Sequence, residues 1–191
     1  DCTGHGVPGA FMSMIGIAIL NDIVIKEGET QPRNILEGLN RLVRRVLKQD
    51  EEGSNQDGMD VALVAWDANH RVKVLFAGAK RPLYYMKNGK IEEIRGVQKS
   101  IGGQQLKARE FVQEEIEVPS DTVLYLFTDG YTDQSIGTGN ARIGTAKFKE
   151  LLETHSSRSL AEQKSLLESF LVEQQGENPQ RDDITVVGIR V

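Results

Sequence analysis

The sequence predicts an α+β fold in which two pairs of helices cover a block of mainly antiparallel strands. Apolar residues recur at helical spacing in two stretches near the start of the chain and in two near its end. Between them lie short apolar or alternating segments separated by turn residues, as expected of antiparallel strands. Two sheets, each covered on its outer face by one helix pair, would bury the apolar faces of all these elements.

The first helix pair is marked by two prolines. Pro8 stands where proline is favoured in the first turn of a helix, and mostly apolar residues fill Ala10–Ile25 before Gly28 ends the stretch. Since this segment is apolar nearly all round, we expect it to be largely buried. Pro32 opens a second helix, to about Lys48, that carries a single apolar stripe.

Seven strands and a second helix pair follow. Asp67–Asn69 and Asn88-Gly89 read as turns that close two hairpins. The expected helices are Lys147–Thr154 and Leu160–Gln175. The expected strands are Val61–Trp66, Val72–Ala77, Leu83–Met86, Ile91–Ile94, Phe111–Val118, Thr122–Phe127 and Ile184–Val191.

Composition excludes several classes of protein. Hydrophobic residues make up 39% of the chain and charged residues 27%, which is ordinary for a soluble domain, and the net charge of −5 argues against nucleic-acid binding. The longest apolar run, Phe11–Leu20, is too short and too interrupted by glycine to span a bilayer, so we expect no direct membrane contact. Cys2 is the only cysteine, which fits a cytoplasmic location.

Candidate chemistry lies in aspartates at strand ends and turns. Asp1 opens a glycine-containing loop, Asp129 follows a strand inside Thr128-Asp-Gly130, and the Asp182-Asp183 pair precedes the last strand. Each alone is a common turn residue. Together, converging carboxylates repel one another unless a cation lies among them, and hard oxygen ligands suit Mg²⁺ or Mn²⁺.

The motifs around these aspartates resemble those of the bacterial SpoIIE/RsbU-type serine phosphatases, which belong to the metal-dependent, type-2C (PPM) protein phosphatase family. The matching segments are Asp1-Cys-Thr-Gly-His-Gly-Val-Pro-Gly-Ala-Phe-Met12, Gly58-Met-Asp-Val-Ala62, Ala77-Gly-Ala-Lys-Arg-Pro-Leu83, Leu124-Tyr-Leu-Phe-Thr-Asp-Gly-Tyr-Thr-Asp-Gln134 and Gln180-Arg-Asp-Asp-Ile-Thr-Val-Val187. The resemblance spans essentially the whole chain. It implies a four-layer α-β-β-α sandwich with a two-metal site, holding Mn²⁺ or Mg²⁺, at one rim of the sheets.

The resemblance also implies residue roles. By position, Asp1 would bridge both metal ions, the backbone carbonyl of Cys2 would bind one of them, and Asp129 and Asp182 would hold the other. Asp1, Asp129 and Asp182 are thus the catalytic candidates. Asp183 is expected to support them, although sequence alone does not decide between Asp182 and Asp183. His5 is a candidate general acid, or equally a residue that shapes its loop.

The implied reaction is hydrolysis of phosphoserine or phosphothreonine on a protein by water activated at two metals. Proteins of this group act on small anti-sigma-factor antagonists of the STAS type, and a sensor or receiver module usually lies upstream. A non-catalytic signalling scaffold with the same fold is the main alternative. A different metal-dependent hydrolase would require His-Asp pairs, which the sequence lacks.

The start of the chain suggests a fragment. The chain begins at Asp1, inside a loop that should follow a strand, so residues 1–191 are expected to form one phosphatase domain that lacks its N-terminal strands. In the family, that region supplies a further acidic ligand. We therefore expect weak or no activity from the fragment alone. An uncovered sheet edge would also invite pairing with another copy, so a homodimer is among the expected partners.

Overall fold

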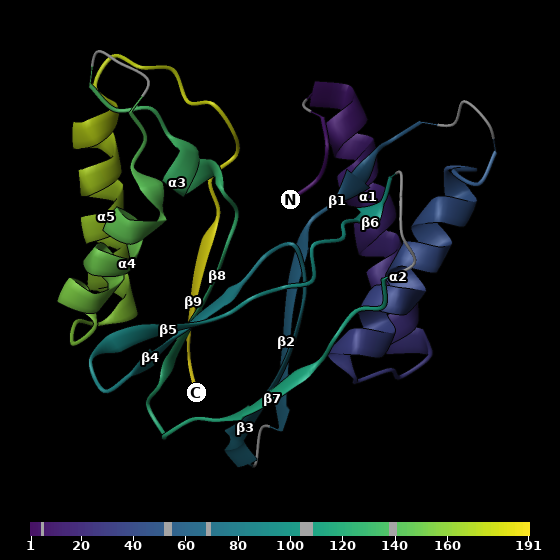
Figure 1. Cartoon of the computed structure of the whole chain (residues 1–191), viewed down its shortest axis with the longest axis horizontal. Coiled ribbons are helices and arrows are strands. Elements are labelled where there is room, and N and C mark those ends of the chain that lie inside the picture. Colours follow the sequence, from purple (N-terminus) through teal and green to yellow (C-terminus); the bar gives the residue numbers. More distant parts are fainter. Residues whose placement is uncertain (5, 52–54, 68–69, 104–108, 138–140) are drawn as a thin grey trace. The chain divides into compact units, whose positions relative to one another are not determined.

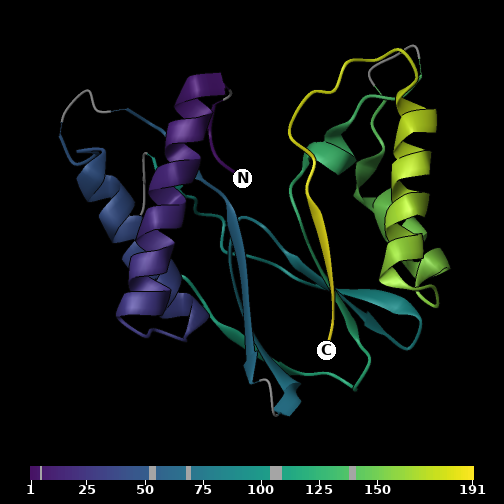
Figure 2. The ribbon, with the colours of Figure 1, turned by 180° about the vertical axis from the view of Figure 1, so that it is seen from behind.

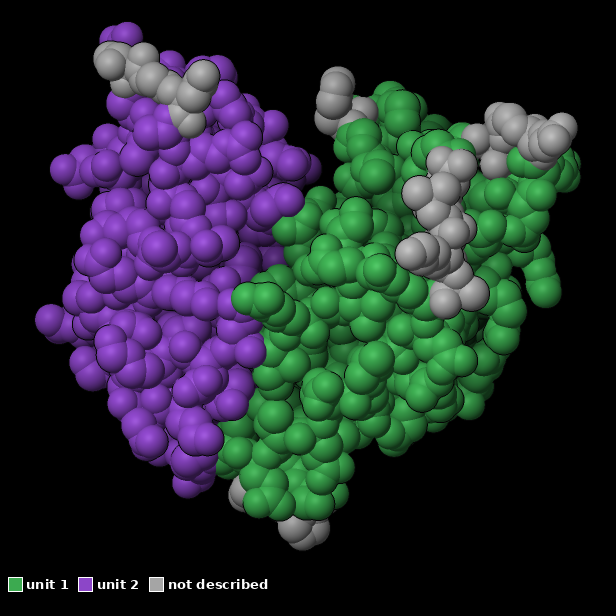
Figure 3. All heavy atoms as spheres, in the orientation of Figure 1, with its two compact units in different colours: residues 1–83, 94–118 green, residues 84–93, 119–191 purple. Residues whose placement is uncertain are grey.

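The structure, a computed structural model, describes residues 1–4, 6–51, 55–67, 70–103, 109–137 and 141–191. These residues divide into two compact units, coloured separately in Figure 3. Unit 1 comprises Asp1–Leu83 and Ile94–Val118, and unit 2 comprises Tyr84–Glu93 and Pro119–Val191. The chain therefore passes from unit 1 into unit 2 and back before it ends in unit 2.

Unit 1 holds the first helix pair and two antiparallel sheets (Figure 1). Its helices are α1 (Gly6–Asn21), which continues into the π-helical turn η1 (Asp22–Lys26), and α2 (Pro32–Val46). Its strands are β1 (Gly58–Met59), β2 (Val61–Asp67), β3 (His70–Ala79), β6 (Ile101–Gly102) and β7 (Glu114–Glu117). Strand β1 pairs with β6, and β3 lies between β2 and β7.

Helix α2 forms as predicted, with Pro32 in its first turn and one buried face. Leu36, Leu39 and Val43 on that face are fully buried, in one core with Ala77 and Ala79 of β3. The arginines of its last turn lie outside this apolar stripe. The apolar stripe read from the sequence is therefore the face that α2 packs against the sheet.

Helix α1 differs from the prediction. It begins at Gly6 and has Pro8 in its first turn, as predicted, but the prediction of a largely buried helix is wrong. Together with η1 it forms a helical stretch of 21 residues, Gly6–Lys26, longer than the apolar run Phe11–Leu20. By length and composition alone this stretch is apolar enough to cross a membrane, as core helices of soluble proteins also are. Only one face of it packs against the rest of unit 1.

Unit 2 holds the second helix pair and a four-stranded sheet in the order β5-β4-β8-β9. The strands are β4 (Leu83–Lys87), β5 (Lys90–Ile94), β8 (Val123–Phe127) and β9 (Val186–Arg190). The helices are the short α3 (Gly130–Asp133), α4 (Gly144–His155) and α5 (Leu160–Gln175). Figures 1 and 2 show α4 and α5 on the same side of this sheet.

Local sequence signals account for two features of unit 2. Asn88 and Gly89 both have positive φ, at 51° and 76°, as the tight turn of the predicted β4–β5 hairpin requires. Ser159 and Glu162 form a reciprocal capping box at the start of α5, which satisfies backbone N–H groups of its first turn. The predicted α+β class, with mainly antiparallel sheets and two helix pairs, is confirmed.

An aromatic cluster forms the centre of unit 2. Phe148 of α4 is fully buried, and its ring centroid lies 5.0 Å from that of Phe127 and 4.9 Å from that of Tyr131. Tyr84 completes the cluster, 4.7 Å from Phe127 between centroids. Since Phe127 and Tyr131 stand on either side of Asp129 in the sequence, the cluster fixes both ends of the segment that carries this aspartate.

Replacing Phe148 by alanine should therefore lower the free energy of unfolding by about 3–5 kcal/mol, because it leaves a cavity among three aromatic rings. Urea unfolding monitored by circular dichroism measures the change. Val172→Ala is the matched control, since Val172 is 70% exposed and should change stability by about 0.5 kcal/mol or less. Equal losses in the two variants would contradict the assignment of Phe148 to the core.

Candidate functional site

The end of β8 and the start of β9 are joined by backbone and side-chain hydrogen bonds. Phe127 pairs with Val186 in the antiparallel ladder, and the N–H of Thr128 donates to the carbonyl of Thr185 at 3.0 Å. The Thr128 hydroxyl donates to the carbonyl of Asp183 and accepts from the N–H of Thr185, both at 3.0 Å. One threonine thus holds the segment before β9 against the segment after β8.

Gly130 allows the two segments to approach even more closely. A Cβ atom built on Gly130 would lie 2.4 Å from the carbonyl oxygen of Asp183, closer than real Cβ atoms come to any atom. Only glycine fits here without moving the backbone. The backbones of the Thr128-Asp-Gly130 turn and of Asp183 therefore lie side by side, so unit 2 brings two of its predicted acidic segments together.

The carboxylates of this region differ in exposure. Asp129 is half-buried at the start of α3, where its carbonyl accepts from the N–H of Asp133 at 2.8 Å. Asp182 and Asp183 are exposed, and the Asp182 carboxylate accepts from the N–H of Asp183 at 2.8 Å. Asp182 and Asp183 both remain candidate ligands.

Asp1 lies in unit 1, alongside the start of the sheet. The N–H of Asp60 donates to the carbonyl of Asp1 at 2.7 Å, and the N–H of Thr3 donates to the carbonyl of Gly58 at 2.9 Å. Residues 1–3 therefore pair with residues 58–60 in an antiparallel bridge centred on Cys2 and Met59. In this register the backbone carbonyl of Cys2 points away from Met59, toward the edge of residues 1–3 that is opposite β1.

An arginine that the sequence analysis did not single out binds the Asp1 carboxylate. Arg81 Nη2 lies 2.8 Å from Asp1 Oδ2 and 3.2 Å from Asp60 Oδ2. The side chains of Arg81, Asp1 and Asp60 are only 14%, 18% and 16% exposed. In this cluster one guanidinium lies between two carboxylates that are shielded from water. Because shielding strengthens electrostatic interactions, the positive charge of Arg81 offsets the repulsion between the carboxylates of Asp1 and Asp60.

Two more side chains complete the cluster around Asp60. The Ser100 hydroxyl donates to Asp60 Oδ1 at 2.6 Å, and Lys80 Nζ lies 3.7 Å from the same oxygen. Asp60 and Arg81 both fall inside motifs noted in the sequence, but no role was attached to them. In the sequence, each is only a charged residue next to apolar strand residues. A role can be assigned only when the fold brings positions 1, 60 and 81 together.

Two further residues were candidates from the sequence, Cys2 and His5. Cys2 is half-buried, and its sulfur accepts a hydrogen bond from the Ser13 hydroxyl at 3.6 Å. This contact fits a structural thiol. His5 lies outside the described residues.

The oxygen donors suit a hard divalent cation, and they are divided between the units. Asp1 and the Cys2 carbonyl belong to unit 1, whereas Asp129, Asp182 and Asp183 belong to unit 2. Carboxylate and carbonyl oxygens are the ligands that Mg²⁺ and Mn²⁺ prefer. Across the parts of the chain that the structure describes, no group of three or more His, Cys, Asp or Glu side chains is close enough to hold a metal. Donors of the type that these ions prefer are therefore present in both units.

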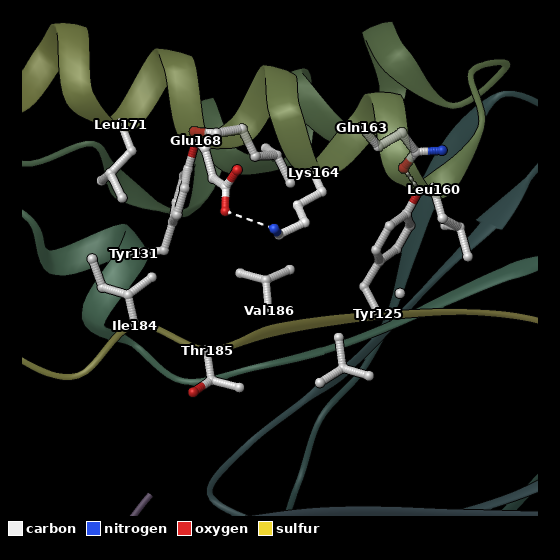
Figure 4. Close-up of a pocket in the computed structure, with 13 residues that line it drawn as sticks. Tyr125, Tyr131, Leu160, Gln163, Lys164, Glu168, Leu171, Ile184, Thr185 and Val186 are labelled. Carbon is white, nitrogen blue, oxygen red and sulfur yellow. Dashed lines mark hydrogen bonds and ion pairs between the residues drawn. The ribbon is translucent and has the colours of Figure 1, made fainter.

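A pocket of about 520 Å³ lies in unit 2 between α5 and β9 (Figure 4). Tyr131, Leu167 and Val186 line its apolar interior, and the Lys164–Glu168 ion pair, at 3.2 Å, stands on its α5 side. Burial raises the pKa of Tyr125, on its wall, to about 12. None of the candidate metal ligands lines this pocket, but Ile184 and Thr185, which follow the Asp182-Asp183 pair, do.

A family model and a solved structure both place the chain among PP2C-type phosphatase domains. The model of the family described as Stage II sporulation protein E (SpoIIE) matches residues 1–191. The PP2C domain of SiaA from Pseudomonas aeruginosa is 33% identical, with a TM-score of 0.87, and the match covers 100% of this chain and 73% of that one. No curated protein matches the sequence.

More distant solved structures share the fold. The PP2C phosphatase domain of SpoIIE from Bacillus subtilis, solved with a fragment of its regulatory domain, is 15% identical with a TM-score of 0.71. That match covers 100% of this chain and 51% of that one. The catalytic domain of the serine/threonine phosphatase PstP, in complex with two manganese ions, is 15% identical with a TM-score of 0.66, covering 98% and 84%.

Proposed function

Because the chain belongs to the SpoIIE family of PP2C-type phosphatase domains, which are hydrolases, we propose that it is a metal-dependent protein serine/threonine phosphatase domain. One observation carries this proposal most strongly. Thr128 and Gly130 hold the Asp129 turn directly against the Asp183 segment, which an ordinary surface turn does not require. In this proposal, residues 1–191 form one domain that uses side chains of both units.

The proposed metal ligands are Asp1 and the Cys2 carbonyl from unit 1, and Asp129 and Asp182 from unit 2. The ions would be Mn²⁺ or Mg²⁺, and the manganese bound to PstP supports this choice. When bound, such ions supply Lewis acidity, which lowers the pKa of water and neutralises charge on phosphoryl oxygens. Asp1, Asp129 and Asp182 are accordingly the residues to which we assign the catalytic role.

The chain's own residues prepare these carboxylates. Arg81 holds the Asp1 carboxylate at 2.8 Å, which limits the directions in which that carboxylate points. The Thr128 hydroxyl and the close contact at Gly130 restrict the backbone on either side of Asp129. Ligands held in this way lose little conformational freedom on binding, which favours a preorganised site.

For the substrate we propose phosphoserine on a small partner protein, an anti-sigma-factor antagonist of the STAS type. The family resemblance of the motifs supports this assignment. A sensor or receiver module upstream would control the activity, as the presence of a regulatory domain in the Bacillus subtilis SpoIIE structure suggests for that protein. The proposed location of the reaction is the cytoplasm.

Hydrolysis of a phosphoserine peptide, measured with Mn²⁺ and with EDTA, tests the proposal. We expect activity in the protein extended upstream of Asp1, its loss in EDTA and its return with excess Mn²⁺. The 191-residue chain should be much less active. Activity that survives EDTA would contradict the metal requirement, and no activity in either protein under any metal would favour the scaffold alternative.

The same assay decides between two neighbouring aspartates. If Asp182 is the ligand, Asp182→Asn should lower the rate and raise the Mn²⁺ concentration needed for half-maximal activity, whereas Asp183→Asn should have the smaller effect. Both side chains are exposed, so neither change should alter stability much. The reverse order of effects would assign the ligand to Asp183.

A further inference from the structure

The loop that carries Asp182 and Asp183 has no regular structure of its own. This acidic loop comprises residues 176–185, between α5 and β9, and none of them lies in a helix or strand. Figures 1 and 2 show that it passes α3 on its way from α5 to β9. Since both aspartates are exposed, contacts made elsewhere in the loop have to set where their carboxylates lie.

The acidic loop is attached at two places to the Asp129 segment, residues 128–134. Near β9, the Thr128 hydroxyl donates to the carbonyl of Asp183 at 3.0 Å. Near α5, Nε2 of the Gln134 side chain donates to the carbonyl of Pro179 at 3.1 Å. Thr128 comes directly before Asp129 and Gln134 comes directly after α3, so the two attachments lie on either side of this predicted ligand.

Gln134 is a buried polar residue whose hydrogen bonds are incomplete. Its side chain has no exposed surface. Its Nε2 donates to the carbonyl of Pro179 and, at 3.3 Å, to that of Ser135. Among the residues that the structure describes, its Oε1 has no hydrogen-bond partner. A buried acceptor without a partner costs free energy, so an apolar side chain of similar length would suit the fold about as well.

Stability therefore does not explain why an amide stands at position 134. Pro179 is exposed, so water can bond to its carbonyl when the loop is detached, and that carbonyl does not need Gln134. What the Gln134 amide supplies is a fixed point for the acidic loop. Residues that serve the fold poorly are expected where they serve a functional site.

We propose that Gln134 is a positioning residue, which fixes the acidic loop so that Asp182 is held near the Asp129 turn before a metal ion binds. The proposal rests on the proposed function and adds to it a residue outside the ligand set. Gln134 contacts no reacting atom. Neighbours that orient a metal ligand typically contribute about 10–100-fold in metal affinity or activity.

A second buried glutamine of unit 2 provides a matched control. Gln163 of α5 is 3% exposed, and its Nε2 donates to the carbonyl of Arg158 at 3.0 Å. Its Oε1, unlike that of Gln134, is paired, because it accepts from the buried Tyr125 hydroxyl at 2.7 Å. Neither partner belongs to the acidic loop or to the Asp129 segment. Replacing each glutamine by methionine thus separates loop attachment from stability.

Order parameters of backbone amides, from nitrogen-15 relaxation of the metal-free 191-residue chain, test the attachment. In the wild type we expect about 0.8 for Gln180–Asp183, and Gln134→Met should lower this value below about 0.6. Its melting temperature should stay within about 3 °C of the wild type, because no buried group loses its partner. Gln163→Met should leave the order parameters unchanged and lower the melting temperature more, because the Tyr125 hydroxyl becomes unpaired.

Manganese affinity tests the consequence for the site. In the protein extended upstream of Asp1, Gln134→Met should raise the Kd for Mn²⁺, measured by electron paramagnetic resonance, at least about tenfold. At saturating Mn²⁺ its kcat for a phosphoserine peptide should stay within about twofold of the wild type, because the ligands themselves are unchanged. Gln163→Met should change neither value.

Three results would overturn the proposal. They are order parameters that Gln134→Met leaves at the wild-type value, a Kd for Mn²⁺ that Gln134→Met leaves unchanged, and a Kd that rises equally in Gln134→Met and Gln163→Met. A wild-type protein that binds no Mn²⁺ and hydrolyses no phosphoserine would refute the proposed function instead. In that case the metal-free order parameters would still show whether Gln134 fixes the acidic loop.

Discussion

Replacing Asp129 by asparagine should lower kcat/KM for a phosphoserine peptide by about a thousandfold. The change keeps the size of the side chain but removes the negative charge that we assign to metal binding. Divalent metal ions at phosphoryl-transfer sites contribute several kcal/mol of transition-state stabilisation, which weaker metal binding would forfeit. Because Asp129 is only half-buried and its carbonyl still accepts from Asp133, the fold should be preserved. Initial rates in Mn²⁺, with the protein extended upstream of Asp1, measure the effect.

Asp133→Asn is the matched control for this experiment. Asp133 lies one helical turn later on α3, is 46% exposed and pairs with Arg142 at 2.7 Å. Its loss should change stability by less than about 1 kcal/mol and should leave the rate close to that of the wild type. If Asp129→Asn were as active as Asp133→Asn, Asp129 would be a turn residue and the metal-site assignment in unit 2 would be wrong.

Replacing Arg81 by methionine should lower the free energy of unfolding by about 3 kcal/mol. The change leaves the carboxylates of Asp1 and Asp60 shielded from water without the guanidinium between them, and breaking a buried ion pair from one side costs about this much. Urea unfolding of unit 1, followed by tryptophan fluorescence of Trp66 on β2, measures the loss.

Arg142→Met is the same substitution at an exposed ion pair. The Arg142 and Asp133 side chains are 50% and 46% exposed, so removing the guanidinium should cost less than about 1 kcal/mol. A loss in Arg81→Met no larger than in Arg142→Met would show that water screens the Asp1–Arg81–Asp60 cluster. The contrast thus tests the shielding of this cluster directly.

Local sequence signals predicted most of the elements. Pro32 and the Asn88-Gly89 turn act on their own backbone, so their effect does not depend on the rest of the fold. The aspartate segments of unit 2 are neighbours because the strands that they flank, β8 and β9, pair with each other, and this pairing was not predicted from the sequence.

What sequence reasoning missed depends on distant parts of the chain. Composition alone could not decide whether α1 is buried. Its apolar residues predict a buried helix, but burial depends on whether other parts of the chain cover its outer face, and in the structure they do not. The role of Arg81 was hidden for a similar reason. It contacts Asp1 across 80 positions of sequence, and only the pairing of residues 1–3 with residues 58–60 brings the two together.

The aromatic cluster of unit 2 has a consequence for how the Asp129 segment can move. Phe127 and Tyr131, two residues before and two after Asp129, are both packed against Phe148. The segment between them cannot swing outward like a hinged lid unless at least one ring leaves the cluster, which carries the cost of opening the core. Any change that moves this segment while the core stays intact therefore has to move Phe127, Tyr131 and Phe148 together with it.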